Sequence, residues 1–296
     1  MKYFKIYKKE YQRTGYDEND ITVCEYMEVN TELNDHNQIL REERYDSDGE
    51  LNTLTINTYN DQLLLIQMEQ YDGDQILLQK SINYYNDKQQ LVQQSNFFGE
   101  DPNEYVTQYV YDEDGNLLRV EMYDDDELDY VEKYMEYENG ILVKESENDD
   151  YGRTLYVSQY AYDDNGLLSK HIRDEIQNKD RRTYEYQYDD NGNCVKELVY
   201  DYGNSLIAKI YRTYNEHNRL VLTEDEDLDN YRQIKMEYEG DKVVKNTILR
   251  KDGTIVGWAE YEYDDNGKER LAREYVPDEV DSSKFRLMRE TRFERA

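Results

Sequence analysis

A turn sequence that recurs at a nearly constant interval constrains this chain more than any other feature. In its clearest copy, Tyr188–Gly192 reads Tyr-Asp-Asp-Asn-Gly, in which short polar side chains and a glycine favour a chain reversal. Tyrosines open the equivalent segments, 24 to 26 residues apart: Tyr59, Tyr85, Tyr111, Tyr137, Tyr162, Tyr188, Tyr214, Tyr238 and Tyr263. A copy without the tyrosine begins at Leu33, 26 residues before Tyr59. A fixed interval of this length is typical of a repeat array.

The residues before each turn alternate as a β-strand requires. Tyr184, Tyr186 and Tyr188 are separated by single polar residues, so their rings share one face of a strand. A looser series of turn sequences lies about halfway through the repeats, for example at Tyr45–Gly49 and Tyr123–Asp126. The predicted fold class is therefore all-β: a long antiparallel meander of about twenty strands, built from hairpin repeats of about 26 residues and coiled or superhelical. The sequence leaves open whether this sheet closes on itself.

The composition fits a thin sheet exposed to water. Hydrophobic residues make up 37% of the chain, and the 33 tyrosines are a large part of them. The 68 acidic and 36 basic residues give a net charge of −32. Such a charge ordinarily favours disorder, but the regular period favours a sheet with aromatic and aliphatic side chains on one face and charged side chains on the other.

Tyr109–Leu117, which reads Tyr-Val-Tyr-Asp-Glu-Asp-Gly-Asn-Leu, resembles the signature of the YD-repeat (Rhs-like) family. Tyr160–Leu167, Tyr186–Val195 and Tyr261–Gly267 are similar to it, and the resemblance covers most of Leu33–Tyr275. It implies long antiparallel sheets that coil, in some members into a hollow shell around a toxin segment. This chain is far shorter than such shells and shows no toxin-like segment, so the resemblance implies the sheet and not encapsulation.

We expect three segments: an atypical N-terminal capping hairpin at 1–32, the YD-like repeat array at 33–276 and a basic C-terminal cap or tail at 277–296. Ser282 and Ser283 are placed to cap a short C-terminal helix over 284–293. Residues 284–296 carry a net charge of +3, which leaves −35 on the rest of the chain. Both a cap over the last strand and a detachable tail that binds a partner fit this composition.

The sequence lacks the motifs of common enzymes and metal sites. His36, His171 and His217 show no metal-ligand spacing with one another or with a cysteine. The acidic turns look like the start of a calcium loop, but the position of the closing glutamate holds Tyr123 or Tyr275. Turn geometry explains these residues, so we expect no enzymatic activity, no cofactor and no metal.

Compartment and redox state follow from what the chain contains. Cys24 and Cys194 are isolated and far apart in sequence, which favours reduced thiols over a lone disulfide. Neither a cationic start followed by an apolar run nor an apolar run of membrane-spanning length is present in this sequence. We therefore expect a cytoplasmic protein without membrane association, whose oligomeric state the sequence leaves open.

Two functions of different classes fit these features. The first is a binding scaffold: a rigid acidic sheet that docks a basic protein, for example as an immunity or inhibitor protein for a toxin or a nucleic-acid enzyme. The second is a structural or carbohydrate-binding YD-repeat protein whose tyrosine rings stack on sugars. The negative charge is also explained if it only keeps an aromatic-rich sheet soluble. It disfavours direct binding of nucleic acid.

The residues expected to take part fall into two sets. The candidates for partner binding are carboxylates that cluster in sequence: Asp124, Asp125, Asp126, Glu127, Glu224, Asp225, Glu226 and Asp227. The candidates for a structural role are the leading tyrosines and turn glycines of the clearest repeats: Tyr111, Tyr162, Tyr188, Tyr263, Gly115, Gly166, Gly192 and Gly267. We expect the carboxylates to lie in exposed loops and titrate normally, and the four tyrosines to share one face.

Overall fold

The computed structural model describes residues 2–15, 20–101, 103–124, 127–281 and 283–295, and these form twenty-two β-strands and no helix. The strands are β1 (Lys2–Arg13), β2 (Ile21–Leu33), β3 (Ile39–Tyr45), β4 (Leu51–Tyr59), β5 (Leu65–Asp72), β6 (Leu77–Tyr85), β7 (Leu91–Phe98), β8 (Tyr105–Tyr111), β9 (Leu117–Asp124), β10 (Glu127–Glu138), β11 (Ile141–Asn148), β12 (Thr154–Tyr162), β13 (Leu168–Glu175), β14 (Asp180–Tyr188), β15 (Cys194–Tyr200), β16 (Leu206–Tyr214), β17 (Leu220–Asp227), β18 (Tyr231–Glu239), β19 (Lys242–Leu249), β20 (Ile255–Tyr263), β21 (Glu269–Pro277) and β22 (Phe285–Arg295). In the described part of the chain, no helix is long and apolar enough to cross a membrane.

Consecutive strands pair antiparallel along the whole sheet, which confirms the predicted meander. The pairing of β14 is representative, because it runs antiparallel to β13 before it and to β15 after it. Each period of the sequence supplies two strands, since one turn follows the repeat tyrosine and the other lies halfway to the next.

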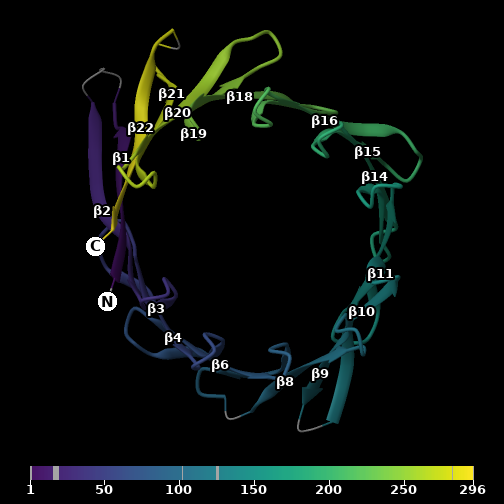
Figure 1. Ribbon diagram of the computed structural model, residues 1–296. Helices are drawn as coiled ribbons and strands as arrows, with labels where there is room; N and C mark the ends of the chain where they lie inside the picture. The colour runs from purple at the N-terminus through teal and green to yellow at the C-terminus, as the bar shows by residue number, and fades with distance from the viewer. Residues whose placement is uncertain (1, 16–19, 102, 125–126, 282, 296) are drawn as a thin grey trace.

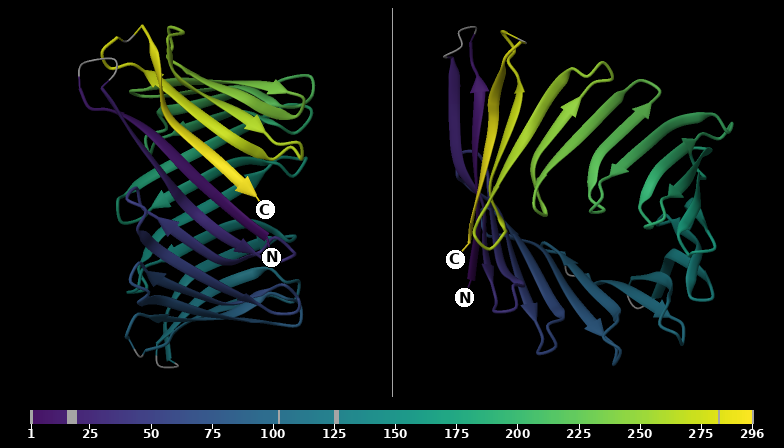
Figure 2. Two further views of the ribbon diagram at one scale, coloured as in Figure 1. Left: turned by 90° about the vertical axis from the view of Figure 1, so that its left-hand side faces the viewer. Right: turned by 45° about the horizontal axis from the view of Figure 1, so that its top comes forward.

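The two ends of the chain close this sheet into a barrel-like ring (Figure 1). β1 pairs antiparallel with β22 as well as with β2, in a register that runs from Phe4 opposite Arg295 to Glu10 opposite Arg289. The two termini consequently lie side by side, as Figure 2 also shows. A closed sheet has no edge strand, so the described strands offer no free ladder through which two copies would pair.

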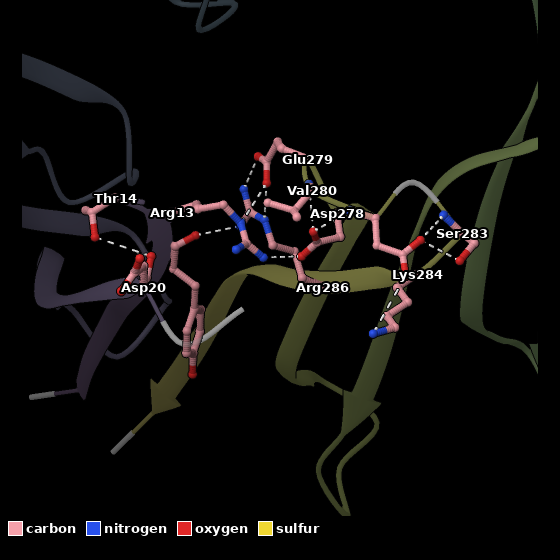
Figure 3. A network of polar contacts seen from close by, with 11 residues as sticks. Arg13, Thr14, Asp20, Asp278, Glu279, Val280, Ser283, Lys284 and Arg286 are labelled. Carbon is pink, nitrogen blue, oxygen red and sulfur yellow. Dashed lines mark hydrogen bonds and ion pairs between the residues drawn. The ribbon is translucent and has the colours of Figure 1, made fainter. Parts of the chain in front are cut away.

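Charged side chains hold the end of the β1–β22 seam that lies away from the termini (Figure 3). Arg13, the last residue of β1, forms ion pairs with Asp278 and Glu279, which follow β21. The Arg13 and Asp278 side chains are only 9% and 10% exposed. Arg286 of β22 pairs with Glu279 and donates a hydrogen bond to the Tyr11 carbonyl at 2.7 Å. The closure therefore depends on side-chain contacts as well as on the ladder.

The helix predicted over 284–293 is wrong, because Phe285–Arg295 forms β22 instead. Ser282, one of its two predicted caps, lies outside the described residues. Phe285, Leu287 and Phe293 occupy alternate positions, as a strand requires. β22 also finds ladder partners on both sides, in β21 and β1, so tertiary pairing overrides the local preference for helix.

The ring is a single layer of sheet. Its solvent-accessible area is 18595 Å², whereas a compact monomer of this mass exposes about 13,000 Å². In the described part of the chain, five hydrophobic residues are buried: Val29, Leu54, Val120, Val199 and Leu249. The sheet is therefore stabilised mainly by the hydrogen bonds between its strands, and by side chains that bind the unpaired backbone groups at the strand ends, rather than by a thick hydrophobic core.

The closure encloses an open space. Twenty-two strands spaced about 4.8 Å apart and tilted by about 40° give a ring about 45 Å across between backbones. Side chains reach about 5 Å from a sheet, half the spacing of stacked sheets, which leaves a lumen about 35 Å wide. Substantial contacts in the described chain run only between neighbouring strands, in agreement with this estimate.

Candidate partner-binding surface

The aspartate after the repeat tyrosine organises each turn. Asp189 accepts hydrogen bonds on Oδ1 from the backbone N–H groups of Asn191 and Asn193, each at 2.9 Å. The Gly192 N–H donates to the Asp189 carbonyl at 3.0 Å, and Gly192 has a φ of +81°. Hydrogen bonds from the Asn193 side chain and backbone lower the pKa of Asp189. In the calcium-like turns the first aspartate, Asp112 or Asp264, is used by its own turn in the same way.

The repeat tyrosine binds a backbone carbonyl of an earlier strand. The Tyr188 hydroxyl donates to the Leu168 carbonyl, 20 residues before it, at 2.8 Å. The β13–β14 ladder begins at Lys170, so Leu168 has no ladder partner on that side. The tyrosine therefore satisfies an acceptor that the sheet leaves unpaired.

The structure places the other predicted repeat residues in the same arrangement. The hydroxyls of three further tyrosines donate to carbonyls 20 residues earlier: Tyr111 to Leu91, Tyr162 to Leu142 and Tyr263 to Val243, at 2.7–2.9 Å. The turn glycines all have positive φ: Gly115 +96°, Gly166 +79°, Gly192 +81° and Gly267 +77°. The register puts these tyrosines on one face of the sheet, which we call the tyrosine face.

One rim of the ring carries a series of carboxylates that the sequence analysis did not single out. Eight connections between an even-numbered strand and the next have five residues, and the second of these is always acidic and exposed: Asp35, Asp61, Asp87, Glu113, Asp164, Asp190, Glu216 and Asp265. Even-to-odd connections of a closed meander all lie at the same end of the ring. We call this set the acidic crown. In seven of the eight turns the carboxylate follows a Tyr-Asp or Tyr-Asn pair, and Asp35 follows Leu33-Asn34.

Most of the net charge lies outside the strands. Counted by sequence, the segments between strands carry −26 and the strands −6. The connections at the crown end carry −11, and those at the opposite end −15. Both rims of the ring are therefore strongly acidic, while the wall is close to balanced.

The first predicted acidic cluster is described only in part. Asp124 ends β9 and Glu127 begins β10; both are exposed, and they face each other in the ladder. Asp125 and Asp126 lie outside the described residues. This pair is separated from the second cluster by the strands β11 to β16, so the ring does not bring the two clusters together.

The second cluster lies in a strand, whereas the sequence predicted an exposed loop. Glu224 accepts hydrogen bonds from Tyr231 and Gln233, at 2.8 and 2.9 Å. Asp225 points to the opposite face, and Asp227 binds the backbone N–H groups of the turn that follows.

Glu226 of the same cluster is held by two lysines. Its carboxylate lies 2.8 Å from Lys209 and 2.7 Å from Lys251, and these contacts lower its pKa to about 2. The expectation of normal titration is therefore wrong for Glu226. Since Glu224 and Glu226 are already paired, this cluster is a poor candidate for partner binding.

His171 is a residue whose position the sequence did not reveal. Its ring stacks between Tyr160 and Tyr184, with centroids 4.8 and 5.2 Å away, and lies 3.2 Å from the fully buried Ser158 hydroxyl. Burial, followed by the charge of Arg173, lowers the pKa of His171, so it is neutral near pH 7. The stack is a polar packing element on the tyrosine face.

The described residues contain no group of three or more histidines, cysteines and carboxylates able to hold a metal ion. His36 and His217 lie at equivalent turn positions. Their backbone N–H groups donate to the side-chain oxygens of Asn34 and Asn215. Cys24 in β2 and Cys194 in β15 are free thiols.

No family model and no curated protein matches the chain. Among solved structures, the chain is similar to TcdB2-TccC3, with 14% identity and a TM-score of 0.39, covering 84% of this chain and 16% of that chain. It is also similar to a porin-like protein from Bacteroides uniformis ATCC 8492, with 11% identity and a TM-score of 0.36, covering 99% of this chain and 97% of the other. A porin-like protein from Bacteroides vulgatus ATCC 8482 has 12% identity and a TM-score of 0.24 over 80% of this chain and 98% of the other.

This chain spans about a sixth of the TcdB2-TccC3 chain that it matches. The likenesses are too distant to assign a family or an activity. The functional argument therefore depends on the chain's own charges and geometry.

Proposed function

We propose that this protein is a non-enzymatic, acidic binding scaffold of the YD-repeat type that docks a basic protein in the cytoplasm. An immunity or inhibitor protein for a toxin or a nucleic-acid enzyme is the use that fits best. The acidic crown is the observation that supports this proposal, because it sets eight exposed carboxylates in equivalent positions around one rim.

The crown spacing suits a partner with an extended basic face. Crown residues in successive hairpins are two strands apart, which is about 10 Å across the sheet. Screening at physiological salt reduces the interaction between exposed charges beyond about 8 Å, so neighbouring carboxylates repel one another only weakly. For a partner that contacts several loops, the attractions to the separate carboxylates add. Its association therefore slows as the salt concentration rises.

The test compares two variants with the same change in charge. The crown variant replaces Glu113 by Gln and Asp164, Asp190 and Asp265 by Asn. The control variant replaces four exposed carboxylates of the opposite rim by Asn: Asp48, Asp74, Asp150 and Asp229. None of the eight side chains accepts a turn hydrogen bond in the described structure, so both variants should fold.

The partner is first captured from the native host and identified by mass spectrometry, and its binding rates are then measured at low and physiological salt. The crown variant should associate about tenfold more slowly than wild type, and the control much less so. If both variants slow association equally, the rate depends on the total negative charge of the protein and not on the crown. A partner that is acidic or a neutral glycan, or binding indifferent to salt, would exclude electrostatic docking. A glycan would instead favour stacking on exposed rings such as Tyr151 and Tyr202, which are 77% and 71% exposed.

A further inference from the structure

In the middle of the array, side chains of β12 and β13 cover the tyrosine face with a ring and a cation. The His171 ring stacks on Tyr160, with centroids 4.8 Å apart, and lies 3.2 Å from the Ser158 hydroxyl. Two residues further along β13, the Arg173 guanidinium lies 3.6 Å from the centroid of the Tyr156 ring. The five residues share one face, because His171 lies opposite Tyr160 and Arg173 opposite Ser158 in the ladder. In this middle repeat, the space above the two strands is filled.

The last repeat has small residues at the same positions. In β20 and β21, Tyr261 lies opposite Ala272 and Ala259 lies opposite Glu274. Counted from the repeat tyrosine, these four residues and Gly257 are the equivalents of the five in the middle repeat. An alanine therefore takes the place of the histidine ring, a glutamate that of the arginine, and a glycine that of the outer tyrosine. The ring of Tyr261 is retained.

The retained ring is anchored as its counterpart is. In the middle repeat, the Tyr160 hydroxyl donates to Glu145 of the preceding strand at 2.7 Å. In the last repeat, Asn246 of the preceding strand donates to the Tyr261 hydroxyl at 3.2 Å. Both contacts are made at equivalent ladder positions. The ring of Tyr261 is therefore held in the orientation that accepts a stacked ring in the middle repeat.

The smaller side chains leave a groove of about 350 Å³ over the last five strands, β18 to β22 (Figure 1). Three small residues line it beside Tyr261: Gly257, Ala259 and Ala272. Aliphatic side chains of the same face enclose it: Ile234, Ile248 and Val276. Trp258 and Tyr275 also border the groove, but their rings stack on each other on the opposite face, so they contribute backbone here. The volume is within the range of small-molecule sites, about 300–1,000 Å³.

Glu274 gives the groove a negative charge. Its carboxylate lies 3.7 Å from the Arg289 guanidinium, but that guanidinium is closer to Glu10, at 3.3 Å. One cation is thus shared between two carboxylates, and the Glu274 side chain is 39% exposed. A protonated amine in the groove would balance the remaining negative charge.

We propose that this groove binds a small aromatic amine. Its planar ring lies over Ala259 and Ala272 and stacks on Tyr261, where the middle repeat has a histidine ring. Its ammonium group lies beside Glu274, where the middle repeat has the guanidinium of an arginine.

Both parts of the ligand contribute to this choice. Ring stacking favours an aromatic amine over an aliphatic one, and a charge-assisted hydrogen bond to Glu274 favours it over a neutral ring. An aromatic acid would bring a second negative charge next to Glu274 and be repelled. This inference does not rest on the proposed function, since it uses neither the crown nor a protein partner.

Isothermal titration calorimetry tests the site with three probes: tryptamine, n-butylamine and indole-3-acetate. Physiological salt is used because it weakens the general attraction of cations to the acidic rims. Tryptamine should bind saturably in the millimolar range or tighter. n-Butylamine has the ammonium group without the ring and should bind at least about tenfold more weakly. Indole-3-acetate has the ring with the opposite charge and should show no saturable binding.

Two variants locate the binding in the groove. Ala272→His supplies the ring of the middle repeat, so it should fill the groove and weaken tryptamine binding by about tenfold or more without lowering the melting temperature. Glu274→Gln keeps the shape but removes the charge, and it should weaken binding about fivefold.

The matched controls are Ala161→His and Glu237→Gln, at exposed positions of β12 and β18 on the opposite face of the sheet. Both should bind tryptamine as wild type does. Thermal melts by circular dichroism check that the variants are folded; if Ala272→His unfolds, Ala272→Val is titrated instead. The proposal is overturned if wild type shows no saturable binding of tryptamine in the millimolar range, or if n-butylamine or indole-3-acetate binds as well. It is also overturned if the folded Ala272 variant binds as tightly as wild type, or if the controls lose as much affinity as the groove variants.

Discussion

Tyr188→Phe isolates the contribution of the repeat tyrosine to the sheet. The substitution keeps the ring but removes the hydroxyl that donates to the Leu168 carbonyl at 2.8 Å. A neutral hydrogen bond of this kind contributes about 1 kcal/mol, and the half-buried carbonyl regains part of that from water. We therefore expect the free energy of unfolding to fall by about 1 kcal/mol and the melting temperature by about 1.5–2 °C.

The same strand offers a matched control. Tyr186→Phe removes a hydroxyl from an adjacent residue of the tyrosine face, for which the described residues provide no hydrogen bond, and it should be nearly neutral. Urea unfolding gives the difference in stability, and amide exchange should quicken around the β13–β14 ladder in Tyr188→Phe alone. Because the repeats are separated, replacing Tyr111, Tyr162, Tyr188 and Tyr263 together should cost about 4 kcal/mol. If Tyr186→Phe costs as much as Tyr188→Phe, the hydroxyl contact is not what stabilises the repeat.

Two further predictions concern the turns and the charges. Gly192→Ala should cost about 1 kcal/mol, since an L side chain is strained at positive φ, whereas Gly203→Ala, at a turn glycine without positive φ, should cost less; equal melting temperatures would contradict this. The pKa of Glu226 lies at about 2, below its ordinary 4.5, so its contribution to stability is present above about pH 4.5 and is lost as the pH falls toward 2. Lys251→Gln removes one cause of that shift and should reduce the acid-dependent loss of stability, as followed by circular dichroism; an unchanged acid titration would contradict the assignment.

The repeat could be predicted from the sequence because its determinants are local. A tyrosine, an aspartate and a glycine at fixed spacing specify a turn, and alternation specifies the strands on either side. Two repeats reach the same left-handed turn position without glycine or asparagine, at Leu63 and Gln89, where φ is +64° and +63°. The period identified these copies, although their own residues did not.

The closure of the ring and the pairing of the clustered carboxylates could not be predicted from local sequence. The pairing of β1 with β22 depends on the summed twist and tilt of every strand between them, so no local segment encodes it. The last strand was taken for a helix because one of its two ladder partners, β1, is at the opposite end of the sequence. Glu224–Asp227 lacks apolar alternation and so looked like a loop, yet Lys209 and Lys251, from the neighbouring β16 and the β19–β20 connection, neutralise it within the sheet.

The closed antiparallel ring also has a parity. In a meander, the first and last strands can pair antiparallel only when the total number of strands in the ring is even. Each repeat contributes two strands. Loss or duplication of one whole repeat preserves that parity and changes the circumference by one part in eleven, whereas gain of a single strand forces the closing pair to run parallel. Ring size in such a chain is therefore free to change by unequal recombination in units of one repeat, with the two terminal strands still meeting in the correct direction.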